Sequence, residues 1–391
     1  MSEWKEKSLG ELIDVKHGYA FKGEFISNEP TDDILVTPGN FNIGGGFKQD
    51  KFKYYKGDFP KDYILKENDI VITMTDLSVS TDTLGYSAKI PKQNGIRFLH
   101  NQRIGLVKFI SNSADREFLY WLMRTSEYQG FIIGSASGTS IMHTAPSRIR
   151  EYSFLLPPIP EQIQIASILS SLDDKIDLLH RQNKTLEQLA ETLFKQWFVE
   201  EAEEKWGVGT IEDEFDFVMG QSPLGATLNE NKNGMIFYQG RTDFEFRFPT
   251  PRVYTTHPTR LAKKFDTLVS VRAPVGDMNI AIEDCCLGRG VAAFRYKHNT
   301  SFYTYTYYKM RSLMGQIKQF EDSGTVFGSI GKDDFRKLEN FLPPENLIQQ
   351  FQNKVKSFDD KIYSNTNQIM TLIQLRDTLL PKLMSGEVRV A

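Results

Sequence analysis

The feature that most constrains this 391-residue chain is an internal repeat, in which segments recur 186 residues further along. Leu-Pro-Pro at 156–158 recurs at 342–344, and Asp-Asp-Lys-Ile at 173–176 recurs at 359–362. Upstream of these segments the offset drifts, and it reaches 202 at the N-terminal end of the copies. This period is too long for a solenoid unit. The repeat therefore predicts a duplicated unit, in which each copy is a globular domain followed by an arm of fixed length.

Each arm is predicted to be one long helix. Pro158 and Pro160 suit a first helical turn, and Glu161 suits the positive end of the helix dipole. Apolar residues then recur at spacings of four and three over five heptads, which favours a left-handed coiled coil. The core positions of the first arm are Ile165, Leu169, Leu172, Ile176, Leu179, Asn183, Leu186, Ala190, Leu193 and Trp197. Those of the second arm are Phe351, Val355, Phe358, Ile362, Asn365, Ile369, Leu372, Arg376, Leu379 and Leu383, and Pro381 is expected to kink or end that helix.

The two arms are expected to pair antiparallel, because a pseudo-two-fold axis would bring the second helix back along the first. Asn183 is the polar core residue of the first arm, and Asn365 is one of two in the second. Pairing the two asparagines in one layer satisfies both buried amides. The same register sets Arg376 on Leu172, where its guanidinium can reach Asp173.

Composition excludes several classes of protein. No apolar run approaches the ~18 residues of a membrane helix, and the N-terminus lacks the pattern of a secretory signal, so a cytoplasmic protein is expected. The two cysteines, Cys285 and Cys286, are adjacent and cannot form a disulfide framework or a thiolate zinc site. The chain has no phosphate-binding loop, dinucleotide fingerprint or metalloprotease motif. A binding or scaffolding role without catalytic residues, metal or cofactor in this chain is therefore expected.

A basic and aromatic stretch lies at the same place in each copy, at 47–56 and 241–260. Arginine and lysine can contact phosphates or base edges, and aromatic rings can stack on bases. An ordinary charged strand face above core aromatics is the alternative, but the matched position favours a site. In and around these stretches, the candidate residues for contact with a nucleic acid are Lys22, Lys51, Lys53, Tyr54, Arg97 and Arg103 in the first copy, and Gln239, Arg241, Arg247, Arg252, Arg272 and Arg289 in the second.

The globular parts are predicted to be mixed α+β structure. Short buried strands are expected at 69–72, 104–107 and 266–269, and helices at 113–129 and 300–320. The predicted domain bounds are 1–155 and 206–341 for the globular domains, with helical arms at 156–205 and 342–391. At ~1.5 Å per residue, an intramolecular pair of such helices would separate the two domains.

Several segments carry a resemblance to a known family. The run Leu156-Pro157-Pro158-Ile159-Pro160-Glu161-Gln162, the helix that contains Leu172–Ile176 and the repetition of the whole unit resemble the DNA-specificity subunit of type I restriction-modification systems. Gly220-Gln221-Ser222-Pro223 and Arg272-Ala273-Pro274-Val275-Gly276 are similar to segments of that family's target-recognition domains. The second copy departs from the pattern, because Leu342-Pro343-Pro344 continues as Glu345-Asn346 without Pro-Glu-Gln.

The resemblance implies a non-catalytic subunit with two target-recognition domains, each of which reads one part of a split, asymmetric double-stranded DNA site. The paired helices would act as a spacer and as a docking surface for two methyltransferase subunits. Those subunits would bind S-adenosylmethionine and flip an adenine for methylation at N6. Two motor and nuclease subunits that use ATP and magnesium could join. The alternative is an interaction scaffold with two binding domains on a coiled coil and no nucleic acid.

Overall fold

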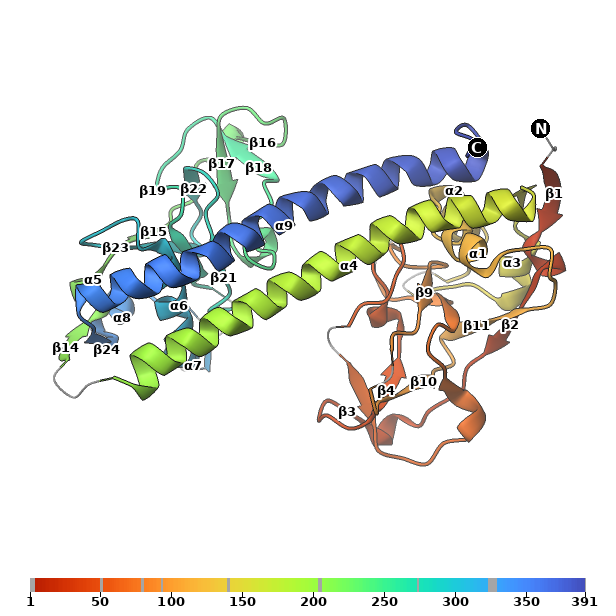
Figure 1. Ribbon diagram of the computed structural model, residues 1–391, viewed down its shortest axis with the longest axis horizontal. Coiled ribbons are helices and arrows are strands. Elements are labelled where there is room, and N and C mark those ends of the chain that lie inside the picture. The colour runs from red at the N-terminus through yellow and green to blue at the C-terminus, as the bar shows by residue number, and fades with distance from the viewer. Residues whose placement is uncertain are drawn as a thin grey trace. The chain divides into compact units, whose positions relative to one another are not determined.

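The computed structural model describes residues 4–49, 52–78, 81–92, 94–138, 141–202, 206–272, 274–322 and 329–390. The chain forms two compact units, the first from residues 1–178 and 368–391 and the second from residues 179–367. Two long helices, α4 (Ile159–Lys195) and α9 (Glu345–Ser385), each contribute one part to either unit (Figure 1). The mixed α/β domains and the long helix between them in sequence confirm the predicted fold class.

The first unit contains two larger sheets. An antiparallel sheet has the order β2 (Ile13–His17), β11 (Ile104–Phe109), β7 (Ile70–Thr73) and β9 (Ser87–Lys89). A mixed sheet has the order β3 (Ile26–Ser27), β5 (Lys53–Tyr55), β4 (Asp33–Val36), β10 (Arg97–His100) and β6 (Ile64–Leu65). Two small sheets pair β1 (Lys5–Ser8) with β13 (Ser153–Leu156), and β8 (Thr75–Asp76) with β12 (Met142–His143). The helices are α1 (Arg116–Leu122), α2 (Ser126–Gly134) and α3 (Pro146–Glu151).

The second unit repeats the larger sheets strand for strand. Its antiparallel sheet has the order β15 (Phe215–Met219), β23 (Val291–Tyr296), β20 (Thr267–Ser270) and β21 (Met278–Ile280). Its mixed sheet has the order β16 (Leu228–Asn229), β18 (Val253–Thr255), β17 (Met235–Tyr238), β22 (Cys285–Leu287) and β19 (Leu261–Ala262). The pair β14 (Gly207–Thr210) and β24 (Glu339–Leu342) matches β1 and β13. The helices are α5 (Ile211–Glu214), α6 (Tyr303–Ser312), α7 (Met314–Asp322) and α8 (Lys332–Lys337).

The three predicted strands are confirmed as β7, β11 and β20, whereas each predicted helix is two helices in the structure. The helix predicted at 113–129 breaks where Thr125 caps α2 by accepting a hydrogen bond from the backbone N–H of Tyr128. The helix predicted at 300–320 breaks at Leu313, between α6 and α7. A cap residue inside an apolar run ends one helix and begins the next, so both expected bounds were wrong.

The long helices complete the core of each unit. In the first unit, Ile165 and Leu169 of α4 and Leu383 of α9 are buried together with Phe118 and Trp121 of α1. Pro381 lies inside α9, which continues to Ser385, so of the two expectations, a kink or an end, the helix end is excluded. Burial of Leu383 in this core favours helix beyond the proline, which removes only one backbone hydrogen bond donor.

The register predicted for the two long helices is confirmed at two layers. In the second unit, Asn365 Nδ2 donates to Asn183 Oδ1 at 2.8 Å, and both side chains are buried. In the first unit, Arg376 Nη1 donates to Asp173 Oδ1 at 2.6 Å. Between these layers the numbers fall along α4 and rise along α9, so the helices run antiparallel. The two polar core positions thus fix the pairing as expected.

Candidate nucleic-acid interface

Several strand ends of the second unit meet at a point where only glycine fits. A Cβ atom at Gly220, directly after β15, would lie 2.1 Å from the carbonyl oxygen of Gly288, which follows β22. A Cβ atom at Gly290 would lie 2.6 Å from the carbonyl oxygen of Gln239, which follows β17. Such separations are far below van der Waals contact, so the absent side chains allow the backbones to pass one another. We call residues 220–222, 239–240, 271–272 and 288–290 the second glycine junction.

Backbone hydrogen bonds hold this junction together. The N–H of Gln221 donates to the Leu287 carbonyl at 2.9 Å, and the N–H of Val271 donates to the Gly290 carbonyl at 2.9 Å. Four exposed side chains result, namely those of Gln221, Gln239, Arg272 and Arg289. Arg272 and Arg289 form no ion pair with any residue in the described ranges of the chain. Amide and guanidinium groups are those that read base edges in the major groove of DNA.

The first unit builds the same junction with different side chains. A Cβ atom at Gly18, directly after β2, would lie 2.0 Å from the Asn101 carbonyl oxygen. The N–H of Tyr19 donates to the His100 carbonyl at 2.8 Å, as Gln221 does to Leu287 in the second unit. We call residues 18–19, 74–75 and 101–103 the first glycine junction.

The exposed groups of the first junction are Gln102 and Arg103, beside the half-buried Tyr19. The backbone pattern aligns Tyr19 with Gln221 and Gln102 with Arg289. The scaffold is therefore shared between the units, whereas the groups that a ligand would meet differ between them.

Two other predicted arginines of the second unit are held by carboxylates. Arg241 Nε lies 2.5 Å from Asp277 Oδ2, and Arg252 Nη2 lies 2.6 Å from Asp243 Oδ1. Asp243 is buried and also accepts a hydrogen bond from the backbone N–H of Gln239 at 2.7 Å. Both arginine side chains remain about half exposed, at 55% and 52%. The carboxylates orient these guanidinium groups and leave donors facing solvent.

Arg247 is not part of this surface, and its assignment as a DNA contact was wrong. Its side chain is fully buried, with Nη1 at 3.2 Å from Asp359 and Nη2 at 3.3 Å from Glu187. Its Nη2 donates to Tyr308 Oη at 2.7 Å, and the guanidinium lies over the Tyr307 ring at 3.9 Å. The loop turns inward because two carboxylates, from α4 and α9, compensate the buried charge. Local composition carries no information about those partners.

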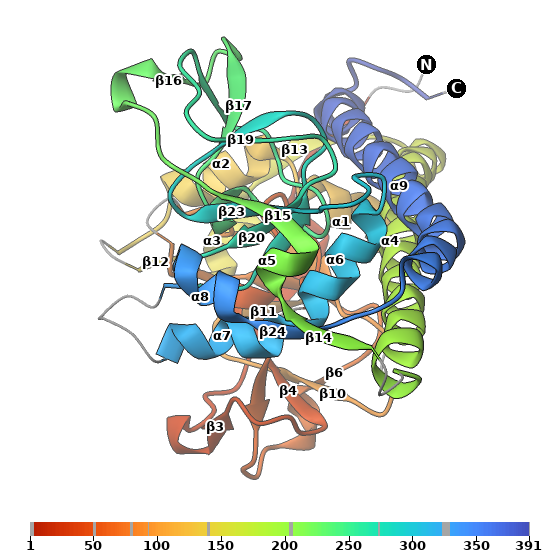
Figure 2. The same ribbon diagram turned by 90° about the vertical axis from the view of Figure 1, so that its left-hand side faces the viewer.

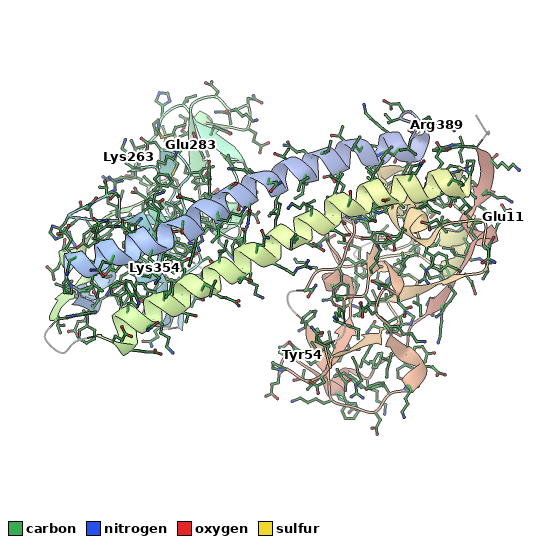
Figure 3. All side chains as sticks on the ribbon, viewed as in Figure 1. Glu11, Tyr54, Lys263, Glu283, Lys354 and Arg389 are labelled. Atoms are coloured by element: carbon green, nitrogen blue, oxygen red, sulfur yellow. The ribbon has the colours of Figure 1, made fainter. Side chains whose placement is uncertain are left out.

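Of the residues predicted in the first unit, Arg103 is the one that belongs to its glycine junction. Arg97 is the first residue of β10 and pairs with Asp33, whereas the junction follows the last residue of that strand. Lys53 donates to Asn28 Oδ1 at 2.7 Å, and the half-buried Tyr54 lies beside it on β5 (Figure 3). Lys22 is exposed a few residues after Tyr19, and Lys51 lies outside the described residues. Their roles stay predictions.

Three junction residues were not among the predicted contacts, namely Tyr19, Gln102 and Gln221. One sequence signal could have found them. Gly18 and Gly220 lie 202 residues apart, which is the offset of the N-terminal ends of the copies, and each follows a five-residue segment that begins with alternating apolar residues. A glycine repeated at a strand end indicates a close backbone approach, so its neighbours were site candidates.

The described part of the chain contains neither a cluster of metal-binding residues nor a helix that could span a membrane. There, no group of three or more His, Cys, Asp or Glu residues is placed to hold a metal ion. Cys285 and Cys286 are buried in β22 as unbridged thiols, and burial raises the pKa of the Cys285 thiol. None of the helices in the same ranges has the length and apolar character to cross a membrane.

Comparisons with known proteins find similar chains and a similar fold. The family model described as the type I restriction modification DNA specificity domain matches residues 1–188 and 203–374. The MjaX chain of Methanocaldococcus jannaschii, which carries the provisional name of a type I restriction enzyme specificity subunit, is 28% identical over 311 residues, covering 75% of this chain and 72% of the relative. The HindI specificity subunit of Haemophilus influenzae is 24% identical and covers 99% of this chain and 100% of its own. A crystal structure of a type I restriction-modification S subunit from M. genitalium superposes with a TM-score of 0.62 at 18% identity, covering 97% of this chain and 96% of that one, and shows the shared fold.

Proposed function

Because the chain belongs to the type I restriction-modification DNA specificity family, we propose that each glycine junction reads one part of a split, asymmetric DNA site. The observation that carries this proposal is the matched pair of junctions. One backbone scaffold occurs twice, with Gln102 and Arg103 exposed in the first and Gln239, Arg272 and Arg289 exposed in the second. Two copies of a scaffold with different donors and acceptors suit two different base sequences.

The chain itself would supply specificity and no chemistry. In this proposal two adenine-N6 methyltransferase subunits dock on it and carry S-adenosylmethionine, and two motor and nuclease subunits with ATP and magnesium can join them. The formal net charge of −3 supports the proposal that the partner subunits provide most of the positive charge that binds DNA. Neutralising many phosphates requires a surplus of lysine and arginine, so most of the electrostatic grip on DNA would come from the partners.

The test is a pair of arginine substitutions in the complex of this chain with its methyltransferase subunits. Arg289→Ala should weaken recognition at one base pair by about 1 to 3 kcal/mol and leave the other half of the site unchanged, because a lost bidentate contact affects one position. Arg103→Ala should change the other half. The readout is the sequence preference of methylation on a DNA library with random half-sites.

Two sets of variants make this test decisive. Lys263→Ala is a matched control, since Lys263 is exposed, pairs with Asp284 and is not a junction residue (Figure 3). It should leave the preference unchanged. Arg97→Ala and Lys53→Ala probe the competing surface on the mixed sheet. If these two variants change the preference while Arg103→Ala does not, the reading surface is that sheet. A complex that methylates without sequence preference, or a chain that binds no DNA with its partners, would contradict the proposed function.

A further inference from the structure

Four positions that are apolar in the core of the first unit are occupied by polar residues in the second. Matching strand pairings and helices align Leu12, Phe118, Leu122 and Phe154 with Glu214, Tyr305, Lys309 and Asn340. All four polar residues are buried, at 3%, 0%, 6% and 7% exposed. The first unit has the same fold with apolar side chains at these four positions, so the fold does not require polar side chains there.

The polar cluster is only partly satisfied. Tyr305 Oη donates to Glu214 Oε1 at 2.5 Å, and Lys309 Nζ donates to the Phe341 carbonyl at 2.9 Å. Lys309 lies 3.9 Å from Glu214 Oε2, which is an ion pair and not a hydrogen bond. Asn340 Oδ1 accepts no hydrogen bond from any described residue. A buried acceptor without a donor costs about 1 to 3 kcal/mol of folding free energy. A ligand that donates a hydrogen bond to this acceptor would recover that free energy on binding.

Lys309 and Asn340 line a cavity of about 420 Å³. Most of the residues that line it are apolar, and they include Phe194 and Phe198 near the end of α4 and Leu313 at the end of α6. β14, β24, α6 and α7 lie around this end of the second unit (Figure 2). A cavity with apolar walls and a few convergent polar groups is the usual form of a binding site.

The rim of the cavity is exposed and combines three apolar side chains with the polar side chains of Ser312, Gln316 and Glu339. Val199, Val208 and Phe341 line the cavity and are 56%, 67% and 53% exposed. At the aligned positions the first unit has Ser385, Glu6 and Leu155. Two of these three apolar side chains, those of Val199 and Val208, therefore belong to the second unit alone, whereas Leu155 is apolar and exposed like Phe341. The exposed apolar side chains extend the site beyond the enclosed volume, which favours a polypeptide over a small molecule, because a small molecule would leave them exposed.

We propose that this cavity receives an apolar side chain and the adjoining peptide group of a methyltransferase subunit, and that only one of the two methyltransferase copies makes this contact. A peptide group carries partners for both Asn340 side-chain atoms that lack one among the described residues, namely a carbonyl acceptor for Nδ2 and an N–H donor for Oδ1. The apolar side chain packs on Phe194 and Phe198. The inference rests on the proposed function and adds to it an asymmetry between the two ends of the assembly.

The test places a photo-crosslinking residue at matched positions of the two units. p-Benzoylphenylalanine replaces Phe341 in one variant and Leu155 in the other, since both residues lie at aligned positions in β24 and β13 and are exposed at 53% and 52%. Each full-length variant is assembled with the methyltransferase, irradiated and analysed by gel and mass spectrometry. We expect a crosslink to one methyltransferase copy from position 341 and none from position 155.

A second variant fills the cavity. Asn340→Phe copies the residue that the first unit has at the aligned position, Phe154, so a folded chain is expected, and thermal unfolding checks this. It should weaken binding of one methyltransferase copy about tenfold and leave the other unchanged. A normal complex that gives no crosslink from position 341, or equal crosslinks from both positions, would overturn this inference alone. A chain that forms no complex with the methyltransferase would overturn the proposed function as well.

Discussion

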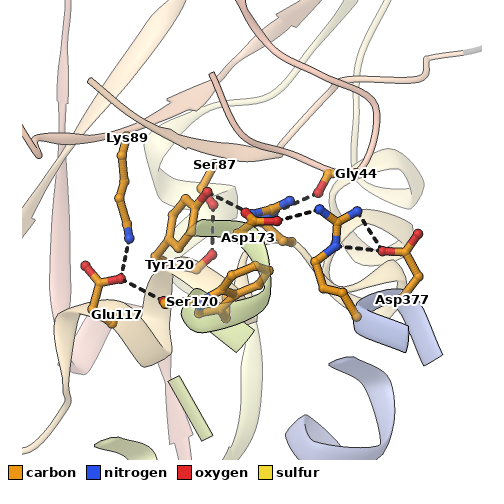
Figure 4. Close-up of polar contacts among 11 residues, drawn as sticks. Gly44, Ser87, Lys89, Glu117, Tyr120, Ser170, Asp173 and Asp377 are labelled. Carbon is orange, nitrogen blue, oxygen red and sulfur yellow. Dashed lines mark hydrogen bonds and ion pairs between the residues drawn. The ribbon is translucent and has the colours of Figure 1, made fainter. Parts of the chain in front are cut away.

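The two units attach their globular domains to the long helices through equivalent aspartates, 186 residues apart, but through arginines from different segments. In the first unit, Asp173 of α4 accepts hydrogen bonds from Arg124 Nη1 and Arg376 Nη1, both at 2.6 Å (Figure 4). In the second unit, Asp359 of α9, which lies 186 residues later, faces Arg247 from the loop after β17. The aspartate therefore occupies the equivalent helix position in both units, whereas its arginine partner comes from a different segment in each.

The loops explain the difference. In the first unit the loop contributes glycine: a Cβ atom at Gly45 would lie 2.6 Å from Arg124 Cγ, and the Gly44 carbonyl accepts from Arg124 Nε at 2.9 Å. The arginine therefore comes from the end of α1 and enters the loop. In the second unit the loop supplies Arg247 itself, and Arg311, the counterpart of Arg124, pairs with Glu187 instead. The arginine of the buried ion pair with the long helix can thus come from the end of α1, as in the first unit, or from the loop, as in the second.

The charge balance differs as well. Burial acts to raise the pKa of Asp173, but Arg124 and Arg376 outweigh it and the pKa lies below its ordinary value of 3.8. Burial raises the pKa of Asp359, and Arg247 opposes this only in part. Burial likewise raises the pKa of Glu187. The first unit has two cations on one acid, and the second has one fully buried cation between two acids.

The largest effect is expected for Arg247→Met. This change leaves Asp359 buried without its arginine, while Glu187 keeps Arg311, and should lower the free energy of unfolding by about 3 to 5 kcal/mol in urea titrations at pH 7. Arg124→Met should cost less, because Asp173 keeps Arg376 and is 25% exposed. Arg241→Met, which removes an exposed ion pair, is the control and should cost less than about 1 kcal/mol. Equal losses for Arg247→Met and this control would remove the contrast between the units.

Matched substitutions of the two aspartates sharpen the contrast through pH. Asp173→Asn should cost about 1.5 to 3 kcal/mol at pH 7, since it removes a charge that two arginines stabilise. A lowered folded-state pKa gives stability above pH 3.8 that is lost as the pH falls through the folded value, so this cost should shrink on acidification.

Asp359→Asn should cost less at pH 7. A raised folded-state pKa means that the wild-type contribution of Asp359 declines as the pH rises from 3.8 through the folded value. Urea titrations of both variants between pH 3 and pH 7 check the two slopes. A cost of Asp173→Asn that grows on acidification, or equal costs for the two variants at pH 7, would show that the aspartates are equivalent.

The smallest effect is expected at the asparagine layer of the second unit. Asn183→Leu leaves Asn365 without its partner and should cost about 1 kcal/mol, at the low end of the usual range because Gln182 Oε1 lies 3.4 Å from Asn365 Nδ2. The double variant Asn183→Leu with Asn365→Leu should recover that loss in the same urea titration, because no buried amide remains. A double variant that is less stable than the single one would contradict the view that this layer sets register and adds little stability.

The sequence by itself determined the features that depend on period and on local chemistry. The offset of 186 residues established the duplication, and the heptad spacing established two helices with a common seam. The register followed because Asn183 and Asn365 each needed a partner, and the reach of Arg376 to Asp173 followed from that register. Polar residues at core positions are few and costly to leave unpaired, so they specify the pairing strongly.

The tertiary structure alone decided which side chains of the loops face solvent. Arg247 and Arg252 lie in one basic stretch, yet one is buried against acids of α4 and α9 and the other is half exposed beside Asp243. Likewise, Gln221, Gln239, Arg272 and Arg289 come together only because glycines let separate strand ends cross. The direction of a loop side chain depends on the charge and volume that residues a hundred positions away place beside it, and a local pattern contains neither.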